Sequence, residues 1–134
     1  MSVTFDEHVR AFLSEPLAAV LATVSPRGRP QATPVWFVLE DSLILVNTSR
    51  GRVKLRNMEA NRHVSLSIVD PRNMYRYVQI RGEAVRFDPQ NGARDIDRLS
   101  MRYTGKPYSY PGGQRPEDRV SVLIKPRSVS GWRG

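Results

Sequence analysis

The longest alternating run in the chain decides the fold: Tyr75-Arg76-Tyr77-Val78-Gln79-Ile80-Arg81-Gly82-Glu83-Ala84-Val85-Arg86-Phe87. Successive side chains of a β-strand point to opposite faces. One face of this run carries Tyr75, Tyr77, Gln79 and Arg81, and the other carries Val78, Ile80, Gly82 and Ala84. A polar face opposite a packed face predicts a half-buried strand, and the glycine indicates a bulge or a close approach of another backbone.

Further strands are expected on both sides of this run, because turn residues separate it from other segments rich in β-branched and aromatic side chains. They are predicted at residues 17–24, 31–39, 43–48, 63–69 and 119–125. The first three of these are expected to form an antiparallel meander. Residues 129–132 are read as a tail that extends the last strand.

Three short helices are predicted between the strands. Thr4-Phe5-Asp6-Glu7 has the form of a capping box at the start of a helix that Pro16 ends. Residues 51–61 suit a second helix, and Asp88-Pro89 suits the start of a third, with proline in the first helical position. Six strands with few helices between them favour a single mainly β (α+β) domain, residues 1–134, built as an antiparallel barrel.

Composition narrows the function. The net charge is +8, and 18 of the 21 cationic residues are arginine, whose planar fork suits phosphates and carboxylates. A phosphorylated small molecule, a nucleic acid and an acidic protein therefore remain open as partners. The chain has no cysteine, and its apolar run at residues 17–24 is far shorter than the roughly 20 residues that span a bilayer. Its N-terminus lacks the pattern of a signal peptide, so we expect a cytoplasmic protein without a membrane partner.

A candidate anion site follows the third predicted strand, in Val46-Asn47-Thr48-Ser49-Arg50-Gly51-Arg52-Val53-Lys54. A strand ends there in hydrogen-bonding side chains, and the next helix begins with free backbone amides and three cations. Such a helix start attracts a phosphate, because its amides and its dipole both favour negative charge. The alternative is a basic helix start that only meets solvent.

The order of several motifs resembles the pyridoxamine-phosphate-oxidase-like split β-barrel family over nearly the whole chain. These motifs are Gly28-Arg29-Pro30 before Thr33-Pro34-Val35-Trp36, then Asn47-Thr48, Lys54 before Asn57, and Asn61-Arg62 before His63-Val64-Ser65-Leu66. Two further segments, Tyr103-Thr104-Gly105-Lys106-Pro107-Tyr108 and Gly131-Trp132, are similar to the branch that uses the deazaflavin coenzyme F-420 where other members use FMN. The resemblance implies a six-stranded split barrel and a homodimer with two cofactor sites at the subunit interface.

The resemblance also assigns the site residues. Thr48, Arg52 and Lys54, preceded by Asn47, would bind the phosphate, and Thr33, Val35 and Trp36 would line the ring. Tyr77 would approach from the long strand, and Tyr103, Lys106 and Tyr108 would come from the following loop, of the same subunit or the other. FMN-using oxidases of the family have an arginine where this chain has Val53 and another where it has Thr33. These departures weaken the FMN reading and argue against pyridoxamine phosphate as substrate, while Arg52 could replace the missing charge.

The expected function is therefore hydride transfer between reduced F-420 and a small unsaturated or aromatic substrate. The cofactor would carry the chemistry, so no catalytic side chain is named, and His8 and His63 have no metal-ligand spacing. The alternatives are an FMN-binding split barrel, either an oxidoreductase or a flavin or haem carrier, and a nucleic-acid-binding barrel. That last alternative rests on interleaved aromatic and basic residues, namely Arg72, Tyr75, Arg76, Tyr77 and Arg81.

Overall fold

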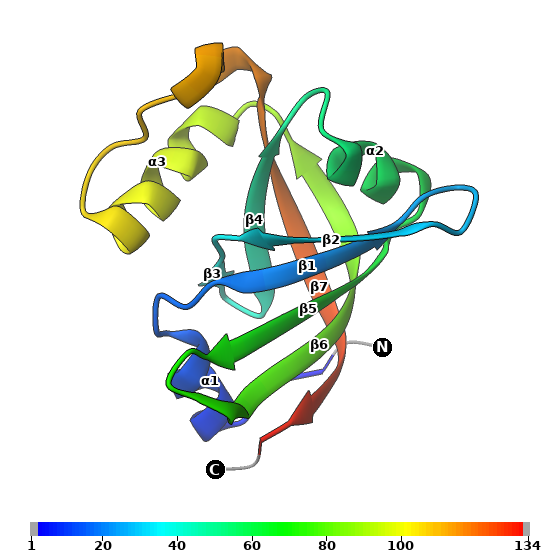
Figure 1. Ribbon diagram of the computed structural model, residues 1–134, viewed down its shortest axis with the longest axis vertical. Coiled ribbons are helices and arrows are strands. Elements are labelled where there is room, and N and C mark those ends of the chain that lie inside the picture. Colours follow the sequence, from blue (N-terminus) through cyan, green and yellow to red (C-terminus); the bar gives the residue numbers. More distant parts are fainter. Residues whose placement is uncertain (1–2, 133–134) are drawn as a thin grey trace.

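The computed structural model describes residues 3–132 and has the expected mainly β architecture (Figure 1). The strands are β1 (Ala19–Val24), β2 (Pro30–Val35), β3 (Val38–Glu40), β4 (Leu43–Ser49), β5 (His63–Asp70), β6 (Asn73–Asp88) and β7 (Arg119–Gly131). The helices are α1 (Glu7–Leu13), α2 (Val53–Ala60) and α3 (Gly92–Thr104), with short 3-10 turns η1 (Pro111–Gly113) and η2 (Pro116–Asp118) before β7. In Figure 1, α2 and α3 lie at one end of the barrel and α1 at the opposite end.

All seven strands form one antiparallel sheet in the order β2-β1-β5-β6-β7-β4-β3. The expected meander is present only as two separate antiparallel hairpins, because β1 pairs with β2 and β3 pairs with β4. It is not continuous, since β2 and β3 lie at opposite ends of this order and β4 pairs with β7 on its other side. The sheet has one strand more than the six expected, since residues 31–39 do not form one strand. The chain leaves the sheet at Trp36 and Phe37, where the Phe37 amide hydrogen bonds to the Tyr103 hydroxyl of α3 and the Phe37 carbonyl accepts from Arg102 Nε.

The long strand β6 holds the barrel together by pairing with β5 on one side and β7 on the other. Its inward face, Val78 to Ala84 in alternation, is buried as predicted. The register with β7 shifts between Arg81 and Gly82, and a Cβ at Gly82 would lie 2.9 Å from the carbonyl oxygen of Lys125. The predicted bulge and the predicted close approach are therefore both present.

Helices α1 and α3 start two and three residues later, respectively, than their cap motifs suggested. The capping box at Thr4 is wrong: Asp6 caps α1, and its Oδ1 accepts from the Val9 amide at 3.1 Å. At α3, Asp88 instead accepts from the Asn91 amide, so the helix begins at Gly92. Within residues 3–132, no helix is long and apolar enough to cross a membrane.

The contact between α3 and β7 fixes one wall of the barrel end. Gly92 is buried against β7, where an added Cβ would lie 2.0 Å from the carbonyl oxygen of Arg119. Because that neighbour is backbone, no side-chain rotation can relieve the clash. Glycine is therefore required at this position for α3 to begin where it does.

Replacing Gly92 with alanine should lower the free energy of unfolding by about 1–3 kcal/mol, because α3 must move away from β7. Chemical denaturation measures this directly. Met101→Ala, at an exposed position of the same helix, is the matched control and should change stability by less than about 0.5 kcal/mol. Equal stability of Gly92→Ala and the unmodified protein would contradict the packing described.

Candidate functional site

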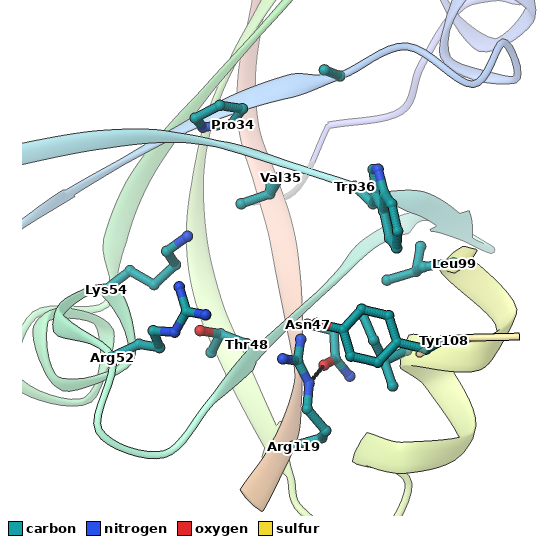
Figure 2. Close-up of a pocket in the computed structure, with 12 residues that line it drawn as sticks. Pro34, Val35, Trp36, Asn47, Thr48, Arg52, Lys54, Leu99, Tyr108 and Arg119 are labelled. Atoms are coloured by element: carbon teal, nitrogen blue, oxygen red, sulfur yellow. Dashed lines mark hydrogen bonds between the residues drawn. The ribbon is translucent and has the colours of Figure 1, made fainter. Parts of the chain in front are cut away.

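A hollow of about 380 Å³ opens at the barrel end between α2 and α3 (Figure 2). Its volume is within the range of small-molecule sites. Residues from six parts of the chain line it: Ala18, Pro34, Val35, Trp36, Asn47, Thr48, Arg52, Lys54, Ile96, Leu99, Tyr108 and Arg119. The lining contains three cations and no aspartate, glutamate or histidine.

One end of the hollow is cationic. Arg52 is the N-cap of α2 and Lys54 lies in its first turn, whose backbone amides have no partner within the helix. Thr48, at the end of β4, adds a hydroxyl and is 4% exposed. Partial burial, together with repulsion from Arg52 and Arg119, lowers the pKa of Lys54 from its usual 10.5. An anion bound here would relieve that repulsion.

The other end is apolar and aromatic. Trp36 stacks on Tyr103 with ring centroids 5.4 Å apart and an angle of 16°, and meets Tyr108 edge-on at 6.3 Å. Ile96 and Leu99 of α3 complete this wall. Flat, fixed aromatic and aliphatic surfaces of this kind suit a planar ring.

Asn47 and Arg119 form the floor between the two ends. Asn47 Nδ2 donates to the Gly92 carbonyl at 2.9 Å and to Ser121 Oγ at 3.1 Å, and its Oδ1 accepts from Arg119 Nε at 2.9 Å. The amide therefore ties β4, α3 and β7 together. Asn47 lines the hollow, and it also holds Arg119 in place.

The structure brings seven of the eleven predicted residues to the hollow: Val35, Trp36, Asn47, Thr48, Arg52, Lys54 and Tyr108. Tyr103 lies directly behind them, because its ring supports Trp36 and its hydroxyl donates to the Leu17 carbonyl at 2.6 Å. Burial raises the pKa of this hydroxyl, so it stays protonated. Tyr103 thus shapes the wall without lining it.

Three predicted residues do not line the hollow. Thr33 precedes the lining part of β2, and its Oγ1 is buried without a hydrogen-bond partner among the described residues. Tyr77 is 40% exposed on the outward face of β6, next to Gly131. Lys106 is exposed, because Gly105 ends α3 in a left-handed conformation and turns the chain away.

Sequence reasoning missed Ala18, Pro34, Ile96, Leu99 and Arg119. Ile96 and Leu99 lie on one apolar face of α3, but periodicity cannot say whether such a face meets a core or a ligand. Arg119 was read only as the first residue of a strand. Its position ahead of the apolar run Val120 to Ile124 was the one available hint.

The surface that suggested nucleic-acid binding is largely ion-paired. Arg76 bonds to Glu15 at 2.9 Å and to Asp70 at 3.0 Å, and Arg72 bonds to Asp70 at 3.2 Å. These hydrogen bonds, first from Arg72 and then from Arg76, lower the pKa of Asp70 to about 2. The two arginines therefore have carboxylate partners within the chain, unlike the cations of the hollow.

Several known proteins are similar to this chain. The sequence pattern of the family described as pyridoxamine 5'-phosphate oxidase matches residues 5–133. A pyridoxine/pyridoxamine 5'-phosphate oxidase of Rubrobacter xylanophilus is 39% identical over 97% of this chain and 71% of its own length. One of the same name from Bacteroides thetaiotaomicron is 34% identical over 91% of this chain, which spans half of that relative. A solved structure described as an F-420 reductase is 32% identical with a TM-score of 0.83, covering 94% of this chain and 98% of that chain.

The lowered pKa of Lys54 predicts a pH-dependent anion affinity. Bound anion favours charged Lys54, so sulfate affinity should fall as pH rises through the lowered pKa, below the pH at which an ordinary lysine loses its proton. Sulfate is the suitable probe because it does not titrate in this range. Calorimetric titration between pH 7 and 11 measures the effect. Lys54→Arg should remove the dependence, and an unchanged profile in that variant would contradict the assignment.

Proposed function

The chain belongs to the pyridoxamine 5'-phosphate oxidase family, and from that premise we propose that it is an oxidoreductase that uses the deazaflavin F-420. The proposed reaction is hydride transfer between reduced F-420 and a small unsaturated or aromatic compound. The observation that carries the proposal is a single hollow with phosphate-binding chemistry at one end and a planar aromatic wall at the other (Figure 2).

The residues present fit a phosphorylated ring cofactor. Arg52 and Lys54 face the hollow with no carboxylate in its lining, so their charge is available to a phosphate. A charge pair at 4 Å is worth about 4 kcal/mol at an effective dielectric near 20. Two such pairs would dominate binding, with the Thr48 hydroxyl as a further donor. Trp36, Leu99 and Ile96 would orient the ring.

Two features support F-420 over FMN. The similarity to an F-420 reductase extends over nearly the full length of both chains. Val53 and Thr33 stand where the FMN-using oxidases of the family have arginines, and Val53 is 42% exposed outside the lining. Arg52, one residue earlier, supplies the helix start with its second cation. FMN remains the alternative, because the curated relatives named above are oxidases of this family.

The chain's own groups would mainly bind and orient. The cofactor supplies the hydride chemistry when bound. No carboxylate or imidazole lines the hollow, so the protein offers few acid–base groups. The lining contains one phenol, Tyr108, whose hydroxyl donates to Gln114 Oε1 at 2.7 Å and is thereby held toward the loop. The substrate would enter beside the ring, where the wall is apolar.

The same family membership supports a homodimer. Several large apolar side chains are exposed on the β5–β6 hairpin: Val69, Met74, Tyr75 and Tyr77. A second copy packed on this hairpin would cover them, and the two cofactor sites would then lie near the subunit interface. Tyr77, which lies outside the hollow of its own chain, would belong to this interface.

The cofactor proposal predicts that Arg52→Gln together with Lys54→Gln weakens F-420 binding at least about 100-fold, because both phosphate-facing charges are lost. Fluorescence titration measures the affinity, with FMN titrated in parallel. Arg56→Gln, an exposed cation one turn along α2, is the matched control and should change affinity less than about threefold. Unchanged affinity of the double variant, with its thermal unfolding intact, would contradict the proposal.

The dimer proposal predicts that Tyr77→Asp shifts the protein toward monomer, since a charge is placed in an apolar contact. Light scattering coupled to size-exclusion chromatography reports the mass. Met101→Asp, at an exposed apolar position on α3, should leave the mass unchanged. A monomeric unmodified protein at all concentrations would rule the dimer out.

A further inference from the structure

Arg119 is a buried cation without an anionic partner. The residue is only 5% exposed, yet within residues 3–132 no carboxylate pairs with its guanidinium. Arg76, another partly buried arginine of this chain, bonds to two carboxylates, those of Glu15 and Asp70. A buried charge is strongly unfavourable unless it is paired, so the unpaired charge of Arg119 lowers the stability of the fold.

The contacts of Arg119 hold it in position without neutralising it. Nε donates to Asn47 Oδ1 at 2.9 Å and Nη1 donates to Gln114 Oε1 at 3.1 Å, both neutral amides. The guanidinium carbon lies 5.2 Å from the centre of the Tyr108 ring. Among the described residues, Nη2 has no hydrogen-bond partner. Burial, and to a smaller extent repulsion from Arg52, lowers the pKa of this guanidinium.

The position of Arg119 separates it from the start of α2. Figure 2 shows Arg52 and Lys54 at one end of the hollow, Trp36 and Leu99 at the other, and Arg119 on the floor between them. A ligand whose phosphate lies on α2 and whose ring lies on Trp36 would therefore present the intervening edge of its ring to Arg119.

We propose that Arg119 is a positioning and specificity-determining residue that binds a negatively charged or electron-rich oxygen on the ring of the occupant, a group separate from its phosphate. The inference rests on the proposed function. It deepens that function, because it requires a ring that carries such an oxygen beside its aromatic surface. A ring oxygen that gains negative charge on reduction would bind Arg119 more tightly in the reduced form.

The test uses pairs of ligands that share the same ring system, of which only one member carries the phosphate. FMN and riboflavin are one pair, F-420 and its phosphate-free deazaflavin chromophore are the parallel pair, and sulfate represents the anion alone. Arg119→Gln should weaken both members of a pair by the same factor, about tenfold, and change sulfate binding by less than about threefold, because Arg119 acts on the anion at the start of α2 only from a distance. Arg52→Gln should weaken the phosphate-bearing member and sulfate, and leave the phosphate-free member unchanged.

The midpoint potential of the bound ring is a second measurement, and it should not change if Arg119 has only a structural role. Arg119→Gln should make the bound ring harder to reduce, by about 30 mV for each tenfold loss in preference for the reduced form. Arg119→Lys keeps the charge but loses the planar fork, so it should recover part of the affinity and most of the potential. It also serves as the second variant if Arg119→Gln does not fold, in which case a loss of ring affinity smaller than tenfold, with little change in sulfate binding, still supports the proposal.

The outcomes are distinct. If Arg119→Gln weakens sulfate and the phosphate-bearing ligand but spares the phosphate-free one, Arg119 is a third phosphate contact and the inference is wrong. It is equally wrong if ring affinity and potential both stay unchanged. If neither ligand pair binds the unmodified protein, the proposed function and this inference are both overturned.

Discussion

Three cations repel one another in one hollow, and the other contacts of the site must offset this repulsion. Arg52, Lys54 and Arg119 line a space with no carboxylate in its lining, and burial together with repulsion from the two arginines lowers the pKa of Lys54. A folded chain keeps such an arrangement only when other contacts outweigh it. Here those contacts are the pairing of β4 with β7 and the hydrogen bonds of Asn47 to three elements.

The sheet order explains why the hollow lies where it does. β2 and β3 are the two ends of the sheet, so the chain must leave one end and reach the other at Trp36 and Phe37. Phe37 is fully buried, and its backbone bonds to Arg102 and Tyr103 of α3. The neighbouring Trp36 is thereby left to face the hollow. The segment that crosses from β2 to β3 therefore also provides the aromatic wall of the site.

The sequence predicted features governed by local patterns. The alternation over residues 75–87, the bulge at Gly82 and the basic start of α2 at Arg52 all follow from spacing and residue type. Features governed by tertiary contacts were missed. The break at Trp36 depends on partners in α3, and the start of α3 at Gly92 depends on its approach to β7. Such contacts join residues far apart in the chain, and no local pattern encodes them.

The site divides in the same way. Residues next to the turn between β4 and α2 were found because chain proximity places them together, and Val35, Trp36 and Tyr108 were found from the family resemblance. Arg119, on a distant strand, was found by neither route. The central claim is that a phosphate lies at the start of α2, and a crystal structure of the protein with F-420 or FMN bound tests it most directly. We expect phosphate oxygens within hydrogen-bonding distance of Arg52, Lys54 and the Thr48 hydroxyl. A phosphate bound elsewhere, with these side chains reaching into solvent, would contradict the account.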